Sequence, residues 1–588
     1  MQIRRDKAVD PITVEVIRNF YAATAQQMTN VLVKGAFTPA IYEMKDFSLG
    51  LFTRDAELIA EGRALAVFLG SLTFAIQDVV KYVGEENLEE GDLVLSTHPY
   101  WIGSHPQDAT MIRPIFIEGR LFGYAAAKAH WLDLGAKYSY GTDTTDVFQE
   151  GLQLFGVKLV KRGVLDREIV EIIRANTRTP SAVVGDMAAQ ISCCEFGAQR
   201  VKSLVAKYGA DTVEQSVREA LAYGEAIARR EIASMPDGEW TAEAGLDNDG
   251  VSDEPIPIKV SVKIAGDEMH IDTTGSAKQQ IGPVNCPLGR TMSTARLVMK
   301  MIVAPEYPAN EGFFRPVKVH APLGSMYNPV SPAATFIYGL ASRPLGEAMF
   351  KALAQAVPHR SVAGSGGEIG ICSVWHQDRD SGIYRGGGWN EATGQGASWN
   401  EDGESALANY QLGDSRNVPI EIIEERYPVL MERYELWQDS AGPGKFRGGL
   451  GVRRRWRSLT DVSLTSGVDQ TRFPPFGVSG GKSAFPNTIT IGIGTPHERQ
   501  IRKISGYQIR SGEIVEYRMG GGGGWGDPLE RDPEAVLADV SAGYVSVSAA
   551  RSEYGVVIKT SLDGSLLEID HEETRHDRKN RSLGSARE

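Results

Sequence analysis

"GSHPQDATMIRPIFIEGRLFGYAAAKAH", residues 103–130, predicts a β-hairpin whose two ends carry polar side chains. Apolar, strand-like runs flank a turn at residues 118–120, while the glycine and proline near the start make the first residues too irregular for a helix. Because a hairpin returns its far end to the point where it began, we expect His130 to lie beside His105 and Asp108.

Two imidazoles and a carboxylate are a ligand set that suits Zn²⁺, Mn²⁺ or Fe²⁺. Asp46, at the head of a second predicted hairpin, is a candidate fourth ligand. The spacing alone leaves an alternative open, namely a hydrogen-bonded core histidine and a turn aspartate, because no helix fixes the interval between the ligands. The sequence therefore predicts a metal site here without excluding a structural role.

Two further polar residues flank this hairpin. Asp133, in "HWLDLG", is a candidate outer partner of a ligand that would fix an imidazole tautomer, or a plain turn residue. His98, in "STHPY", is a weaker candidate for the same outer role, with packing or hydrogen bonding near the rim as the alternative.

The rest of the chain predicts an α+β, or mixed α/β, protein. Asp10 and Pro11 begin a helix, in which apolar side chains recur at spacings of four, four and three residues: Ile12, Val16, Phe20 and Ala23. Residues 160–235 favour helices and residues 362–566 favour strands.

With 588 residues the chain exceeds the roughly 250–300 at which one hydrophobic core stops growing, so several subdomains are expected. They are an N-terminal metal-binding region (1–235), an α/β middle region (236–361), a Gly-rich, β-rich C-terminal region (362–566) and a charged, loosely ordered tail (567–588).

Composition narrows the class of protein. The net charge of −13 disfavours nucleic acid as a partner, and the one basic run, residues 453–457, predicts a strand with one solvated face. No apolar run approaches the ~20 residues of a membrane span, and no apolar stretch follows the N-terminal charges as in a secretory signal. We therefore expect no membrane partner and a cytoplasmic location.

Few residues outside the hairpin suggest chemistry. The four cysteines (Cys193, Cys194, Cys286 and Cys372) form no C-x-x-C pair and are expected to be buried thiols. Ser365 lacks the strand and helix that flank a hydrolase nucleophile. The glycine run at residues 520–524 lacks the P-loop order, so we expect a structural role for it and no nucleotide-binding site in this chain.

Several ordered motifs spread over about residues 9–557 are familiar: "DPITVEVIRN", "KDFSLGLF", "HPYWIGSHPQDATMIRPIF", "QEGLQLFGVKLVKRG", "GPVNCP", "ERYELWQDSAGPGKFRGGLG" and "GGGGGWGDP". By these motifs the chain resembles the hydantoinase B/oxoprolinase family. The resemblance implies work with a hydantoinase A-type subunit that binds ATP and Mg²⁺, in a hetero-oligomer such as a dimer of heterodimers. Such pairs hydrolyse cyclic amides (hydantoins, lactams, 5-oxoproline) or carboxylate ketones such as acetone and acetophenone.

The resemblance also implies one divalent metal, Zn²⁺ or Mn²⁺ with Fe²⁺ as an alternative, in the B-type chain. The family's ligand pattern maps onto His105, Asp108 and His130, with Asp46 matching a further carboxylate that some members use. No catalytic base is predicted.

The chain departs from the common family pattern beside these ligands. Trp101, Trp131 and Leu132 would make a substrate pocket larger and more apolar, unless they only pack beneath the ligand loops. Chain length favours a small-molecule cyclic amidohydrolase, whereas the apolar residues favour a ketone carboxylase. A third hypothesis is a non-catalytic scaffold subunit whose partner carries all of the chemistry.

Overall fold

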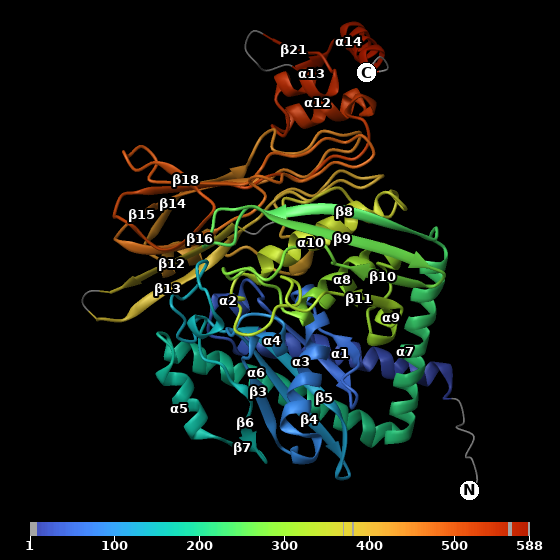
Figure 1. The fold of residues 1–588 in the computed structure, drawn as a ribbon, viewed down its shortest axis with the longest axis vertical. Coiled ribbons are helices and arrows are strands. Elements are labelled where there is room, and N and C mark those ends of the chain that lie inside the picture. Colours follow the sequence, from blue (N-terminus) through green and yellow to red (C-terminus); the bar gives the residue numbers. More distant parts are fainter. Residues whose placement is uncertain (1–8, 368–369, 379–380, 562–566, 586–588) are drawn as a thin grey trace.

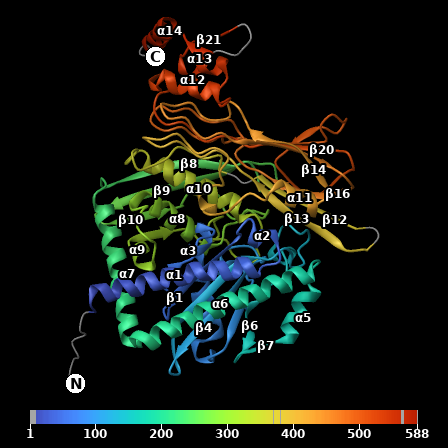
Figure 2. The same cartoon turned by 180° about the vertical axis from the view of Figure 1, so that it is seen from behind.

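The computed structural model describes residues 9–367, 370–378, 381–561 and 567–585 of the 588. Figures 1 and 2 show a stack along the long axis, with the N-terminal sheet and its helices at one end, the middle region beside them, and the last helices at the opposite end.

The N-terminal sheet has seven strands, and all neighbouring strands are antiparallel. Their order is β2 (Leu58–Glu61), β1 (Phe47–Thr53), β5 (Arg120–His130), β4 (Asp108–Ile117), β3 (Leu93–Ser96), β6 (Phe155–Lys161) and β7 (Val164–Leu165). The two hairpins predicted from the sequence, β1–β2 and β4–β5, are confirmed.

Both faces of this sheet are covered, so its central strands have no solvated side. Since side chains alternate along a strand, Ala125, Ala127 and Ala129 of β5 pack toward α1 (Pro11–Gly35) and α6 (Pro180–Tyr208), while Tyr124 and Ala126 pack toward α3 (Ala66–Val83). The parity places His130, and Asp108 opposite it, on the α3 face of the sheet.

The N-terminal helix begins as predicted, with the Asp10 carboxylate accepting a hydrogen bond from the Thr13 N–H, but the apolar residues whose spacing predicted it do not form its buried face. Ile12 and Val16 are exposed, and the residues packed in the core are Ile17, Tyr21, Ala25, Met28 and Leu32. The helix carries apolar residues on two sides. The side with Ile17 and Tyr21 is buried because it packs against α6 and β2.

Among the described residues, α3 is the one helix long and apolar enough to cross a membrane. Leu72, Ile76 and Val79 of this helix are buried against the sheet, and α3 also packs against α8 (Leu288–Val303), as the core helix of a folded domain does.

The middle region is a four-stranded sheet covered by helices. Its strand order is β11 (Val317–His320), β10 (Glu268–Asp272), β9 (Ile256–Ala265) and β8 (Gly238–Leu246). Burial alternates strictly along β9, whose inner face packs against α10 (Tyr338–Leu353). Because α8 contacts both α10 and α3, the middle region is joined to the N-terminal one through helices.

Two sheets with a common core follow. One is ordered β13 (Tyr384–Glu391), β12 (Gly370–Gln377), β16 (Val462–Gly467) and β19 (Lys503–Ile509). The other is ordered β14 (Val429–Leu436), β15 (Val452–Ser458), β20 (Ile514–Arg518), β17 (Thr488–Ile491) and β18 (Arg499–Ile501).

The basic run lies in β15 and alternates as predicted, with Arg453, Arg455 and Arg457 partly solvated. Arg454 is on the opposite, buried face, where its Nε lies 3.2 Å from Glu391 Oε2. The prediction of a strand with one solvated face is therefore confirmed, while one of its arginines forms part of a buried ion pair.

The glycine run at residues 520–524 is extended, and the segments that surround it on several sides are also free of regular helix or strand. The Gly522 N–H donates to the Gly449 carbonyl at 2.9 Å, and the Gly442 N–H donates to the Gly522 carbonyl at 2.8 Å. The other backbone partners of the run are Gly364, Gly394, Ala397, Val478 and Lys482. A Cβ atom on Gly522 would lie 1.9 Å from the Gln395 carbonyl oxygen, so the close approach requires glycine.

The prediction of a loosely ordered tail is wrong for most of its length, because residues 571–585 form helix α14 (His571–Ser585). Thr574 is buried, and its hydroxyl accepts a hydrogen bond from the Val557 N–H at 3.0 Å. Arg578 donates to the carbonyls of Tyr554 and Arg531. Hydrogen bonds of Thr574 and Arg578 thus hold the helix against the rest of the chain. A prediction of disorder from low apolar content does not take such bonds into account.

Candidate metal centre

The β4–β5 hairpin pairs Asp108 directly with His130, and the loop before β4 brings in His105. His130 Nδ1 lies 2.9 Å from Asp108 Oδ1, and His105 Nε2 lies 3.1 Å from both of these atoms. One ligand atom from each residue lies within 4.8 Å of the other two, in a buried group. The predicted approach of the three side chains is confirmed, and their spacing fits a shared cation.

Residues from the middle region orient these side chains. His105 Nδ1 donates to the Phe336 carbonyl at 2.7 Å, so the lone pair of the neutral ring is on Nε2 and faces the cluster. Asp108 Oδ2 accepts a hydrogen bond from the Tyr338 hydroxyl at 2.9 Å, which leaves Oδ1 for the cluster. Outer partners of this kind fix ring orientation in metal sites.

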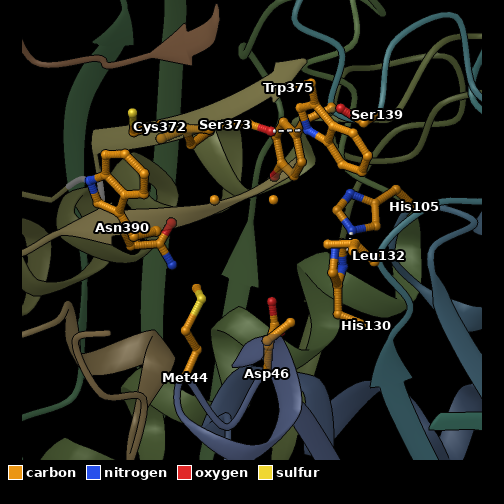
Figure 3. Close-up of a pocket in the computed structure, with 16 residues that line it drawn as sticks. Met44, Asp46, His105, His130, Leu132, Ser139, Cys372, Ser373, Trp375 and Asn390 are labelled. Atoms are coloured by element: carbon orange, nitrogen blue, oxygen red, sulfur yellow. Dashed lines mark hydrogen bonds between the residues drawn. The ribbon is translucent and has the colours of Figure 1, made fainter. Parts of the chain in front are cut away.

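Asp46 lies at the same cavity, between the short helix α2 (Pro39–Tyr42) and β1 (Figure 3). Its backbone carbonyl accepts from the His130 N–H at 3.0 Å, whereas its Oδ1 is buried with no hydrogen-bond partner among the described residues. Burial raises the pKa of Asp46 to about 6, against the lowering effect of His130. A buried carboxylate oxygen without a donor is costly, and a bound cation would satisfy it, so the residues present fit a divalent metal.

The side chains of the cluster shift one another's pKa values. Burial alone would raise the pKa of Asp108, but the two histidines hold it well below its ordinary value. Burial alone would lower the pKa of His130, but its hydrogen bond to Asp108 and the charge of Asp46 raise it. Asp108 is therefore an anion at neutral pH, and a proton on His130 competes with any cation.

The cluster opens into a cavity of about 100 Å³ at the junction of two parts of the chain (Figure 3). The N-terminal region contributes Ala40, Met44, Asp46, His105, His130, Leu132, Ser139 and Tyr140, and the β12–β13 hairpin contributes Ile371, Cys372, Ser373, Trp375, Gly387, Gly388, Trp389 and Asn390. The C-terminal hairpin thus covers the ligands with an apolar wall that carries two indoles and one amide.

Of the three residues predicted to line a substrate pocket, Leu132 lines this cavity on its N-terminal side and the two tryptophans lie elsewhere. Trp131 is fully buried on the α6 side, with Nε1 donating to Gln190 Oε1 at 3.2 Å, because it has the opposite parity to His130. Trp101 packs in a separate aromatic group with Tyr82, His98 and Phe155.

The two residues predicted as outer partners of the ligands are engaged away from the imidazoles. The Asp133 carboxylate lies 2.6 Å from the Arg178 guanidinium and also accepts from the Arg178 N–H, so it anchors the loop before α6. His98 Nδ1 is 3.0 Å from Gln153 Oε1, and its ring stacks on Phe155 at a centroid distance of 4.2 Å. His98 therefore packs near the rim, which was its alternative role.

Sequence reasoning missed the orienting residues Phe336 and Tyr338 and the wall residues Ser373, Trp375 and Asn390. They lie more than 200 residues beyond His105 in the chain, and no local motif marks them. The four cysteines are buried as predicted, and burial raises the pKa of each thiol.

Comparison with known proteins gives concordant matches over nearly the whole chain. A protein from Pseudomonas sp. (strain NS671), provisionally named as the B component of a D-/L-hydantoinase, is 33% identical over 97% of this chain and 98% of its own. The beta component of the caprolactamase from Pseudomonas jessenii is 31% identical over 94% of this chain and 96% of its own.

Solved structures show the same fold. The ATP-dependent caprolactamase of Pseudomonas jessenii superposes with a TM-score of 0.89 at 30% identity and covers 97% of this chain and 100% of that one. A nucleotide-free acetone carboxylase also has a TM-score of 0.89, at 20% identity, over 98% of this chain and 84% of that one.

The sequence pattern of the family named hydantoinase B/oxoprolinase matches residues 10–528. Since this match spans most of the chain, the chain belongs to the hydantoinase B/oxoprolinase family.

Proposed function

We propose that this chain is the metal-binding B-type subunit of an ATP-dependent, two-component cyclic amidohydrolase. The observation that carries the proposal is the buried His105–Asp108–His130 group with the unpartnered Asp46 oxygen at one small cavity. The 33% and 31% identical relatives, named as components of a hydantoinase and a caprolactamase, support a cyclic amide as substrate.

In this proposal His105, Asp108, His130 and Asp46 hold one divalent cation, Zn²⁺ or Mn²⁺. A divalent metal in such a site polarises a carbonyl oxygen or lowers the pKa of a bound water. The protein groups supply orientation: the Phe336 carbonyl keeps the His105 proton on Nδ1. Burial raises the pKa of Asp46 to about 6 in the absence of a metal, so most of this carboxylate is ionised at neutral pH and available to a cation.

The cavity suits a small ring. A volume of about 100 Å³ holds several water molecules, which favours a small substrate. Trp375, Trp389 and Met44 supply flat or flexible apolar contacts, and the Asn390 amide, which points into the space in Figure 3, offers both a donor and an acceptor. A lactam or hydantoin ring presents the complementary pair.

ATP and Mg²⁺ would be bound by a hydantoinase A-type partner, since the sequence has no P-loop and the backbone groups of its glycine run at residues 520–524 bond to neighbouring segments. The names of the relatives, as the B and beta components of their enzymes, support such a partner. The likeness to acetone carboxylase is at 20% identity and concerns the fold, so it does not favour a ketone substrate over a cyclic amide.

The test is a reconstituted complex of this chain with the A-type chain, assayed with hydantoin, caprolactam and 5-oxoproline. We expect ring opening coupled to ADP release, and loss of ring opening in His105→Ala while the complex stays intact. Unchanged turnover in that variant would identify a scaffold subunit, and bicarbonate-dependent carboxylation of a ketone would identify a carboxylase.

A further inference from the structure

Glu150 is a fully buried carboxylate that lies behind the ligand cluster. Its Oε1 accepts hydrogen bonds from the Thr144 hydroxyl at 2.9 Å, the Thr335 N–H at 2.7 Å and the Phe336 N–H at 2.8 Å. Its Oε2 accepts from the Thr335 hydroxyl at 2.9 Å. All four donors are neutral, and three of them belong to one short segment, residues 335–336.

That segment is the one that orients His105. Phe336 links Glu150 to His105. Its backbone N–H donates to Glu150, and its carbonyl accepts from His105 Nδ1 at 2.7 Å. A second connection runs through Gln107, whose Nε2 donates to the Glu150 backbone carbonyl at 2.9 Å and whose own carbonyl accepts from the Trp131 N–H at 2.8 Å. Glu150 therefore contacts both the segment that holds His105 and the loop between the ligands.

We propose that Glu150 is a positioning residue for His105: by fixing the backbone of Thr335 and Phe336, it presents the carbonyl that takes the Nδ1 proton and so directs Nε2 at the ligand cluster. The inference rests on the proposed metal-binding function. It concerns geometry alone, since Glu150 does not touch the cluster.

The chemistry of the site requires a carboxylate at this position. An ionised carboxylate only accepts hydrogen bonds, whereas the amide of a glutamine presents one acceptor and one donor. In Glu150→Gln, an amide N–H would therefore face at least one of the backbone or hydroxyl donors, and the 335–336 segment would lose its fixed position. Changes in outer partners of metal ligands cost about 10–100-fold in metal affinity.

Glu347 provides a matched control. It is also buried and accepts hydrogen bonds from the Ser365 N–H at 3.0 Å and the Ser365 hydroxyl at 2.6 Å. Burial raises the pKa of Glu150 and of Glu347 to about 7. Glu347→Gln thus removes the same charge from a similar environment. It changes none of the hydrogen bonds that connect Glu150 through Phe336 to His105.

The experiment measures binding of Co²⁺ to the full chain at pH 8 by competition with a chelator, together with the visible absorption of the bound ion, which reports its ligand geometry. We expect Glu150→Gln to bind Co²⁺ about 10–100-fold more weakly with an altered absorption band. Glu347→Gln is expected to match the parent protein in both measurements.

The outcomes separate the two proposals. If Glu150→Gln matches the parent protein while His105→Ala loses binding, the positioning role is overturned and the metal site stands. If His105→Ala binds Co²⁺ as tightly as the parent, the proposed function fails. If circular dichroism shows that Glu150→Gln does not fold, Thr335→Val, which removes one of the four bonds, replaces it; an unchanged Co²⁺ affinity in that variant overturns the role.

Discussion

Replacing Asp46 by asparagine is expected to change the pH dependence of stability of the metal-free protein. The folded chain buries this carboxyl and raises its pKa from 3.8 to about 6. At 1.36 kcal/mol per pKa unit, the charged form is destabilised by about 3 kcal/mol at pH 7 relative to a solvated carboxyl. The sign follows from the raised pKa: the carboxyl contributes stability below its unfolded pKa, and this contribution is lost as the pH rises through about 6.

Lowering the pH from about 7 to about 5 should then stabilise the metal-free parent protein by about 1 kcal/mol through this one group. Asp46→Asn cannot take up the proton, so the difference in stability between variant and parent should shrink by that amount over the same interval. In thermal unfolding this corresponds to a few degrees, at about 2–4 °C per kcal/mol for a region of this size. The assay is unfolding of chelator-treated protein by intrinsic fluorescence, at both pH values.

Glu61 is the control, because burial raises its pKa to about 7 and it lies outside the cavity lining. Glu61→Gln should also alter the pH dependence, but added Zn²⁺ or Mn²⁺ should stabilise it as much as the parent. Asp46→Asn should gain less from the metal. Equal pH dependence and equal metal stabilisation in Asp46→Asn and the parent would refute the assignment of Asp46 as a buried, uncompensated ligand.

Three further perturbations test other features. Metal affinity should fall as the pH is lowered, by about tenfold per pH unit where one proton is displaced, because the cation competes with a proton on His130, whose pKa is raised, despite burial, by its hydrogen bond to Asp108; competition titration at several pH values measures this. Gly522→Ala should abolish soluble folding, since the new methyl group meets the Gln395 carbonyl oxygen, and circular dichroism of the recovered protein checks it. Arg454→Met should destabilise the C-terminal sheets by about 3–5 kcal/mol in urea unfolding, because Glu391 is left charged and buried.

Two of these perturbations have a matched variant. Gly543 has a positive φ but no atom near a built Cβ, so Gly543→Ala should fold with only a modest loss. Arg457 pairs with Glu432 at the surface, and Arg457→Met should cost less than about 1 kcal/mol. A soluble, fully folded Gly522→Ala, a flat pH profile of metal affinity, or equal costs at Arg454 and Arg457 would each contradict its prediction.

The ligand cluster could be predicted because its geometry is local. A hairpin relates His105 and Asp108 to His130 by chain connectivity and strand register, so spacing was sufficient to predict that the three side chains meet, although not that they bind a metal. The same alternation shows why Trp131 is not in the cavity: it has the opposite parity to His130 and faces Gln190. Because successive side chains of a strand point to opposite faces, the sequence itself predicts that His130 and Trp131 lie on different sides of the sheet.

The rest of the site could not be predicted, because it depends on which elements from distant parts of the chain pack together. Phe336 lies 231 residues beyond His105, and the wall residue Trp389 lies on a hairpin of another sheet. The exposed face of the first helix has the same origin, since Ile12 and Ile17 are equally apolar and only contact with neighbouring elements selects Ile17. The tail helix is held by hydrogen bonds from Arg578, which apolar content does not measure.

The distance of 231 residues between His105 and the carbonyl that holds it has a consequence for biosynthesis. At about 5–20 residues per second, the ribosome emits the histidines roughly 10–50 s before the segment that orients them. During that interval His105 has no fixed tautomer and the cavity has no lid. We therefore expect a nascent chain stalled before residue 336 to capture cations weakly, and the finished chain to acquire its ion only after the later half has closed over the hairpin.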